Sequence, residues 1–234
     1  DNNLVDHCDI YRNAGWGVHI YDESSTANNN IVRFSKLHEN ARLGQRGRGM
    51  ILSSGSGNTA YNNLIWGNSG GIQVDYRSVG AKIFNNTIYN NNGATEKYGI
   101  SLGGGGSNTV VRNNIVFQHT GGNIVNSQSG AILSNNLTTD ALFVSAAGLD
   151  FHVRPGSPAI DGGVNLAAEG VTVDFDGVQR PLGAAYDIGA FEYAGAAPPV
   201  SDITAPFLSA ITVSGVSQTG AAIGWTTNEA SDTQ

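Results

Sequence analysis

The chain has 234 residues, with 12 Lys plus Arg against 19 Asp plus Glu, a net charge of −7 and one cysteine. The single cysteine, Cys8, excludes an internal disulfide framework and a multi-cysteine metal site, and no apolar run approaches the roughly 18 residues that a membrane-spanning helix needs. Residues 1–140 hold 10 basic and 9 acidic side chains, whereas residues 141–234 hold 2 and 10. Nucleic acid is therefore excluded as a partner, because most of the chain would repel a phosphate backbone.

An Asn-Asn motif returns through the first 140 residues, which are rich in Asn and Gly and so form helices poorly. Its copies are Tyr61–Trp66, Phe84–Tyr89, Arg112–Phe117 and Ser134–Leu137, with Cys8 and Ser35 in the matching place of two earlier copies. A second motif interleaves with the first, as Gly17–Ile20, Gly49–Leu52, Gly71–Val74, Gly99–Leu102 and Gly122–Val125. Two signals that share one period of about 22 to 32 residues predict stacked coils, each made of several short strands joined by turns.

Alternation along these strands separates an inner face from an outer one. In Val18-His19-Ile20 the two apolar side chains face the core and His19 faces water. Because stacked coils lie about 4.8 Å apart, equivalent residues form continuous columns. The inner column is expected to contain Ile20, Leu52, Val74, Leu102 and Val125. The second Asn of each pair is expected to join an internal ladder of amides, made of Asn63, Asn86, Asn114 and Asn136, and Cys8 is expected to be a small buried rung.

These coils resemble right-handed parallel β-helix repeats of the pectate-lyase-like kind. The resemblance implies an all-β fold with a parallel β-helix of about five to six coils over residues 1–140. It also implies that a substrate groove runs along the outer face of the first strand of each coil, and that the turn before this strand flanks the groove.

The remaining residues are expected to form three further parts. Residues 141–193 resemble the closing segment of choice-of-anchor Q proteins, and Phe151, Val153, Ile160, Ile188 and Phe191 are suited to covering the last coil. Within this segment Asp174, Asp176 and Asp187 are expected to pair with Arg180 rather than to bind calcium. Residues 194–206 read as a linker, and residues 207–234 resemble the first strands of a fibronectin type III-like domain, a partial β-sandwich.

The architecture favours an extracellular or cell-surface location, and the chain is expected to act as a monomer within a larger multidomain protein that extends beyond both of its ends. The expected partner is a polysaccharide, and a local excess of positive charge favours an anionic one. That excess comes from Arg33, Lys36, Arg42, Arg46 and Arg48 against Glu39. No cofactor and no metal is expected.

The outer face of the groove strands supplies most of the candidate residues. It carries His19, Tyr21, Asp22, Ile51, Ser53, Gln73, Asp75, Tyr76, Arg77, Ser101, Gly103, Ile124 and Asn126, and the preceding turns add Arg42, Arg46, Arg48, Glu96 and Lys97. A polysaccharide lyase must neutralise a uronate carboxylate, remove the adjacent proton and protonate the leaving oxygen. The candidate catalytic residues are His19, Tyr21, Arg48, Asp75 and Arg77. The candidate substrate-binding residues are Asp22, Arg42, Arg46, Gln73, Tyr76 and Lys97.

Three function classes remain open at this point. A glycoside hydrolase is the second enzymatic choice, because Asp22 and Asp75 would lie about 10 Å apart, which is marginal for a pair of catalytic carboxyl groups. Neither the polygalacturonase-like motifs nor the Asp-Pro-His-Glu motif of alginate epimerases is present. The non-enzymatic alternatives are a glycan-binding or adhesive surface protein and a purely structural stalk.

Overall fold

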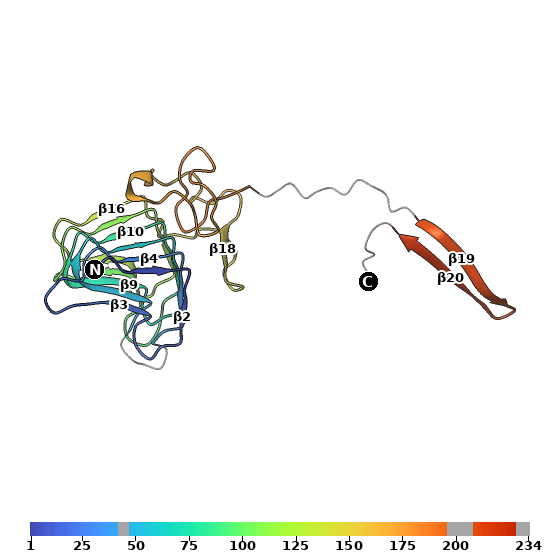
Figure 1. Ribbon diagram of the computed structural model, residues 1–234, viewed down its shortest axis with the longest axis horizontal. Helices are drawn as coiled ribbons and strands as arrows, with labels where there is room; N and C mark the ends of the chain where they lie inside the picture. The colour runs from blue at the N-terminus through green and yellow to red at the C-terminus, as the bar shows by residue number, and fades with distance from the viewer. Residues whose placement is uncertain (42–46, 196–207, 228–234) are drawn as a thin grey trace. The chain divides into compact units, whose positions relative to one another are not determined.

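The computed structural model describes residues 1–41, 47–195 and 208–227. The chain divides into two compact units, residues 1–195 and residues 196–234. In the first unit, short strands stack into a solenoid of three parallel sheets (Figure 1). This arrangement confirms the all-β class and the parallel β-helix.

Each of the first five coils contributes one strand to each sheet, the sixth contributes a strand to the first sheet only, and all neighbours pair in parallel. The first sheet contains β1 (Leu4–Asp6), β4 (Ile31–Arg33), β7 (Thr59–Tyr61), β10 (Lys82–Phe84), β13 (Val110–Arg112) and β16 (Ile132–Ser134). The second contains β2 (Asp9–Tyr11), β5 (Lys36–His38), β8 (Leu64–Trp66), β11 (Thr87–Tyr89) and β14 (Ile115–Phe117). The third contains β3 (Val18–Ile20), β6 (Met50–Ser56), β9 (Ile72–Val79), β12 (Tyr98–Leu102) and β15 (Gly122–Asn126).

The inner column of the third sheet follows the expected register in four coils and departs from it in the fifth. Ile20, Leu52, Val74 and Leu102 are paired in order and buried. In the fifth coil Asn126, not Val125, pairs with Leu102. Ile124 packs against the core, so its expected place on the outer face is wrong. The Gly motif misleads here because Gly122 aligns with Tyr98 rather than with Gly99, which shifts the strand by one residue.

The predicted asparagine ladder is confirmed. The Nδ2 atom of Asn63 donates to Oδ1 of Asn86, Asn86 donates to Asn114, and Asn114 donates to Asn136, each over 2.9 Å. Ser35 continues the ladder through its backbone N–H, which donates to Asn63. Cys8 stands at the next rung but is exposed, so its expected burial is wrong.

Two further ladders were not anticipated. One runs through Asn13, Asn40, Asn68 and Asn91 and ends at His119, with donor–acceptor distances of 2.8 to 3.2 Å. The other joins Asn3, Asn30 and Asn58. In these ladders Asn30, Asn40, Asn68 and Asn91 each accept from one coil and donate to the next, which satisfies polar groups that would otherwise destabilise the interior.

The segment after the coils packs along the flank of the solenoid. It begins with β17 (Phe143–Ser145) and β18 (Asp150–Val153), an antiparallel pair, and contains one short 3₁₀-helix, η1 (Ala167–Glu169). We call residues 154–193 the strap. The strap meets the first Asn of each Asn-Asn pair over four successive coils: Asn62 donates to the Val173 carbonyl, Asn85 to Asp187 and Gly189, Asn113 to Val164, and Asn135 to Gly162. The segment that was expected to cover the last coil therefore lies, at these contacts, along the side of the solenoid.

Apolar contacts reinforce this lateral docking. Leu166, Val171 and Tyr186 of the strap form one buried cluster with the coil residues Phe34, Tyr61 and Phe84. Phe151 of β18 packs beside Trp66 and Tyr89 of the second sheet. The strap therefore shares its core with the coils instead of closing their end.

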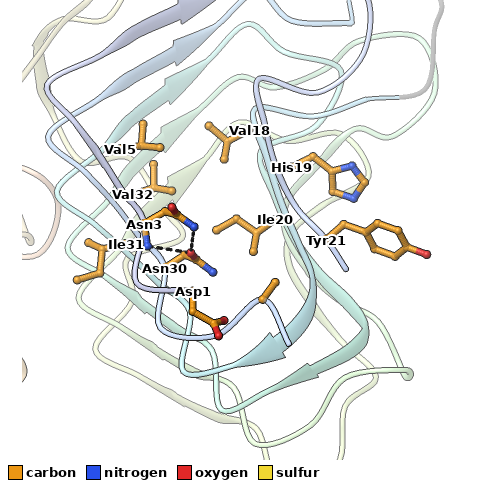
Figure 2. Close-up of a pocket in the computed structure, with 11 residues that line it drawn as sticks. Asp1, Asn3, Val5, Val18, His19, Ile20, Tyr21, Asn30, Ile31 and Val32 are labelled. Atoms are coloured by element: carbon orange, nitrogen blue, oxygen red, sulfur yellow. Dashed lines mark hydrogen bonds between the residues drawn. The ribbon is translucent and has the colours of Figure 1, made fainter. Parts of the chain in front are cut away.

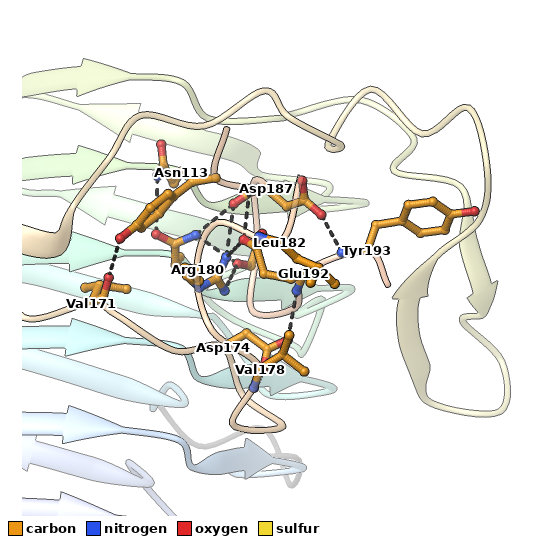
Figure 3. A network of polar contacts seen from close by, with 12 residues as sticks. Asn113, Val171, Asp174, Val178, Arg180, Leu182, Asp187, Glu192 and Tyr193 are labelled. Atoms are coloured by element: carbon orange, nitrogen blue, oxygen red, sulfur yellow. Dashed lines mark hydrogen bonds and ion pairs between the residues drawn. The ribbon is translucent and has the colours of Figure 1, made fainter. Parts of the chain in front are cut away.

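A buried ion pair lies at the centre of the strap (Figure 3). Arg180 Nη1 donates to Glu192 Oε1 over 2.6 Å, and both side chains are fully buried. Arg180 also donates to Asn62 Oδ1, which ties the strap to the coils, and to the Gly189 carbonyl within the strap. The expected partners of Arg180 were Asp174, Asp176 and Asp187. Instead, Asp174 accepts from the backbone N–H groups of Asp176, Val178 and Glu192, and Asp187 accepts from those of Asp161 and Tyr193.

The second unit contains an antiparallel hairpin of β19 (Leu208–Ser217) and β20 (Gly220–Thr227). Two strands are present where two were expected, and their assignment to a fibronectin type III-like domain stays a prediction. Within the described ranges, no helix combines the length and the apolar character needed to cross a membrane.

Candidate functional site

The outer face of the third sheet gathers most of the candidate residues. His19, Ile51, Gln73 and Ser101 follow one another in register across β3, β6, β9 and β12. Figure 2 shows the two faces of the first of these strands: Val18 and Ile20 turn toward the core, whereas His19 and Tyr21 point away from it. The hollow in that view, about 270 Å³, is lined by apolar core residues such as Val5 and Val32 and by polar ones, namely Asp1, Asn3, His19, Tyr21 and Asn30.

Aromatic rings form a continuous row on this face. The ring centroids of Trp16 and His19 are 4.7 Å apart, those of His19 and Tyr21 5.4 Å, and those of Tyr21 and Tyr76 5.9 Å. The Arg77 guanidinium extends the row, 4.9 Å from the Tyr76 centroid. We call these five residues the aromatic strip. Trp16, Tyr21 and Tyr76 are each more than 40% exposed, at 41%, 45% and 43%, so the strip is open to a ligand.

Two groups of the strip have shifted protonation equilibria. Partial burial lowers the pKa of His19 below its usual 6.5, so the imidazole is neutral at neutral pH. Its Nε2 atom lies 3.1 Å from Ser53 Oγ. The pKa of Tyr21 is raised, first by desolvation and then by the charge of Glu23, so its hydroxyl keeps its proton. A neutral base and a protonated acid therefore stand side by side.

Asp75 is held in place by the groups around it. Its Oδ1 atom accepts from the Tyr76 backbone N–H over 2.7 Å and from Gly105 N–H over 3.2 Å, and its Oδ2 accepts from Gln73 Nε2 over 3.2 Å. Gly103 makes room for this carboxylate, because a Cβ there would lie 2.3 Å from Asp75 Cγ. Gln73 and Asp75 thus lie together on the outer face of the third sheet, as expected, and hydrogen bonds hold the Asp75 carboxylate in place.

The expected cationic turn does not contribute Arg48 to this face. Arg48 is 4% exposed and forms an ion pair with Glu96, and burial lowers its pKa. The expectation that Arg48 is an exposed, catalytic cation is therefore wrong, because its side chain is buried and pairs with Glu96 between two turns of the solenoid. Arg42 and Arg46 lie outside the described residues.

The two remaining candidates, Asp22 and Lys97, differ in their surroundings. Asp22 Oδ2 accepts from the backbone N–H and the hydroxyl of Thr26, and these bonds lower the pKa of Asp22. Its carboxylate closes a local turn, so it is committed to structure. Lys97 is exposed in the turn before β12, at a backbone φ of 51°.

Sequence reasoning missed Trp16 as a member of the site. Its place two residues before β3, next to Gly17, is the signal that could have identified it. Gly17 lets the chain approach the next coil, because a Cβ there would lie 2.5 Å from the Gly49 carbonyl oxygen. Among the described residues, no group of three or more His, Cys, Asp or Glu side chains is arranged to hold a metal ion.

Comparisons with known proteins agree with this architecture. Residues 1–138 match the family model described as "Right handed beta helix region". No curated protein matches the chain. Among solved structures, "Crystal structure of pectate lyase Pel9A" is similar at 16% sequence identity and a TM-score of 0.43, covering 81% of this chain and 65% of that one. The chain thus spans less than two thirds of that structure's length, and we base no functional argument on this likeness.

Proposed function

The chain belongs to the right-handed β-helix family, and on this scaffold we propose that the outer face of the third sheet binds a polysaccharide, with an acidic polymer as the preferred ligand. The observation that carries the proposal is the aromatic strip. Sugar rings present apolar C–H faces that pack on exposed aromatic rings, and an elongated strip suits a chain of sugars better than a single one. The strip joins aromatic residues of the first coil to Tyr76 of the third, so neighbouring sugar units could contact neighbouring rings.

The preference for an acidic polymer rests on the cations of this face. Arg77 is exposed, and one of its two terminal nitrogens donates to the Glu23 carbonyl oxygen. This bond holds the guanidinium above Tyr76, where it can pair with a uronate carboxylate. Lys97 adds a second exposed charge. Arg42 and Arg46 belong to the same proposal as further cations of the preceding turn.

A lyase reaction on the bound polymer is a second candidate, favoured by the His19 and Tyr21 protonation states. In β-elimination a base takes the proton from C5 of the uronate. The C4–O bond then breaks, its oxygen leaves with the bonding electrons and takes up a proton, and a C4=C5 double bond remains. Neutral His19 would take the C5 proton, Tyr21 would protonate the leaving oxygen, and Arg77 would neutralise the carboxylate.

Hydrolysis receives less support from the geometry. A hydrolase needs one carboxylic acid that donates a proton and a second carboxylate that acts as base or nucleophile. Asp22 is hydrogen-bonded to Thr26, and Asp75 accepts three hydrogen bonds from Gln73, Tyr76 and Gly105. Neither carboxyl group is placed to donate a proton. A non-catalytic, adhesive protein or a structural stalk therefore ranks above a hydrolase.

The first experiment measures both binding and ultraviolet absorbance with a panel of alginate, pectate, glycosaminoglycans and neutral polysaccharides. Binding of acidic polymers, weakened by salt, would support the proposal. New absorbance from unsaturated ends would add the lyase reaction. Binding without absorbance would leave an adhesive or glycan-binding protein, and no binding to any polymer would favour the structural stalk and contradict the proposal.

The matched variants are Tyr76→Ala and Tyr11→Ala, because both tyrosines are exposed, at 43% and 49%, on different sheets. Loss of one central aromatic contact is expected to weaken acidic-polymer binding about tenfold in Tyr76→Ala, and Tyr11→Ala is expected to bind like the unmodified protein. Equal effects of the two substitutions would rule out the aromatic strip as the binding surface.

We place this activity at the cell surface or outside the cell. The strap as part of an anchoring segment, and the hairpin as the start of a fibronectin type III-like module, belong to the same proposal. Both fit a monomer within a larger multidomain chain.

A further inference from the structure

A second hollow, about 490 Å³, lies on a different face of the solenoid. The second sheet forms one wall of it, and β18 with parts of the strap forms the other. We call it the lateral pocket. Its lining residues are Asp9, Lys36, His38, Leu64, Trp66, Gly148, Leu149, Asp150, Phe151, His152, Phe175, Asp176 and Phe191. This volume is in the range of pockets that hold small organic ligands.

Two rings of the sheet wall, those of His38 and Trp66, belong to a stacked column that begins outside the pocket at Tyr11. Tyr11, His38 and Trp66 follow in register on β2, β5 and β8. The His38 ring lies 5.0 Å from Tyr11 and 4.4 Å from Trp66, with interplanar angles of 3° and 4°. Packed face to face in this way, the rings form a rigid wall whose ring edges are the part left for a ligand.

Carboxylates and imidazoles alternate around the pocket. His38 Nε2 lies 2.9 Å from Asp9 Oδ1. His152 Nδ1 lies 2.6 Å from Asp150 Oδ1, and its Nε2 lies 2.9 Å from Asp176 Oδ2. The carboxylates thus have cationic or hydrogen-bonding partners already. Each keeps further lone pairs that can accept hydrogen bonds from a ligand.

We propose that the lateral pocket binds a neutral sugar unit of an oligosaccharide. Three carboxylates against Lys36 and the imidazoles disfavour a uronate or another anion. Because those carboxylates are already paired, a cation gains little there as well. The hydroxyl groups of a sugar can donate hydrogen bonds to the carboxylates and accept one from Lys36. The C–H groups of the same sugar can contact the edges of the aromatic rings. This inference does not rest on the function proposed for the third sheet.

The three tryptophans of the chain make the two faces separately observable, because Trp16 lies on the third sheet, Trp66 lines the lateral pocket and Trp225 belongs to the second unit. In the variant Trp16→Phe/Trp225→Phe, Trp66 is the remaining reporter of fluorescence. Neutral hexose and pentose oligosaccharides are expected to change its emission in a saturable way that salt does not weaken. Oligouronates at the same concentrations are expected to leave it unchanged.

Two substitutions in this background test the pocket itself. Asp176→Asn removes a carboxylate at the pocket, and Leu149→Arg fills its rim at a side chain that is 50% exposed, so that folding is preserved. Each is expected to weaken neutral-saccharide binding about tenfold. Glu23→Gln, an exposed carboxylate near the third sheet, is the matched control and is expected to have no effect.

Three outcomes would overturn the proposal: no response of Trp66 to any neutral saccharide, a response that both substitutions leave intact, or a stronger response to oligouronates. A response only to amino sugars that disappears in high salt would replace it with a cation site. A parallel titration of Trp66→Phe/Trp225→Phe with oligouronates follows Trp16, so failure at one face is separable from failure at the other.

Discussion

Two faces of the same solenoid carry different outward side chains, and the strap covers one face but not the other. Along the flank, the first Asn of each Asn-Asn pair points outward and donates to the strap, at Asn62, Asn85, Asn113 and Asn135. Along the third sheet, the equivalent outward residues change from coil to coil, as His19, Ile51, Gln73 and Ser101. The flank repeats one donor and is covered, whereas the third sheet varies and stays open in the described unit.

The difference teaches how a repeat can separate stability from function. A regular row of amides suits a backbone segment, because every carbonyl of that segment can accept the same kind of hydrogen bond. A varied row suits a ligand with different groups along its length. The following substitutions test this division, beginning with the one that should cost most.

Arg180→Met is expected to lower the free energy of unfolding by about 3–5 kcal/mol, because it leaves Glu192 as an unpaired buried charge. Urea unfolding followed by circular dichroism measures this loss. Burial already raises the pKa of Glu192, so without Arg180 this carboxyl group will take up a proton more readily. The loss should therefore be smaller at pH 5 than at pH 8. The double variant Arg180→Met/Glu192→Gln should regain part of it, and a double variant no better than the single one would contradict the ion-pair explanation.

His119 makes the stability of the coils depend on pH. Burial lowers its pKa from 6.5 to about 4, and its neutral ring accepts a hydrogen bond from Asn91. The unfolded chain binds a proton at this residue at a higher pH than the folded chain does. Its contribution is therefore complete above pH 6.5 and is lost as the pH falls toward 4, by about 3 kcal/mol in total.

His119→Asn continues the ladder with the residue type of its other rungs and should remove this component. Unfolding free energies of both proteins at several pH values between 4 and 7 measure the difference, and other titrating groups cancel in it. Identical pH profiles would show that His119 does not titrate as proposed.

Asn85→Gly is expected to lower stability by about 1–2 kcal/mol, because two strap carbonyls lose one donor each while Arg180 still reaches them. Glycine keeps the left-handed backbone at φ 48°, so the change isolates the side chain. Asn90→Gly is the control, since Asn90 has φ 49° but is exposed and does not meet the strap. Hydrogen exchange of strap amides should rise in Asn85→Gly alone.

Gly103→Ala should have the smallest effect on stability, about 1 kcal/mol or less, because the added methyl group meets the Asp75 side chain rather than backbone. It should nevertheless displace the Asp75 carboxylate from Tyr76 and Gly105. We expect altered polymer binding with nearly unchanged unfolding. Unchanged binding would show that Asp75 is not part of the groove.

The repeating parts of the fold could be predicted because each coil meets the same physical constraints. Alternation gave the inner column in four coils, and the recurrence of Asn gave the first ladder. The second ladder was also present in the sequence, since a rung stands five residues after each rung of the first: Asn40 after Ser35, Asn68 after Asn63, Asn91 after Asn86 and His119 after Asn114. A search at that spacing would have found it.

The non-repeating parts could not be predicted in the same way. The apolar residues of the strap, such as Ile160 and Ile188, would suit the end of a solenoid or its flank equally well. The outward Asn residues of the coils decide between them. Arg48 illustrates the same limit within the site, because its burial depends on Glu96, a residue two coils later that no local pattern connects to it.

The asparagine ladders also bear on how such a molecule can change its size in evolution. In each ladder the amide of one coil donates to the oxygen of the next coil along the chain, always in the same direction. A coil added by duplication would interrupt one such hydrogen bond. Its own amide would accept the same kind of bond from the coil before it and donate the same kind of bond to the coil after it. Within the ladders, length can then change by whole turns without leaving an amide unpaired, so that insertions and deletions of one period are the changes the ladders tolerate best.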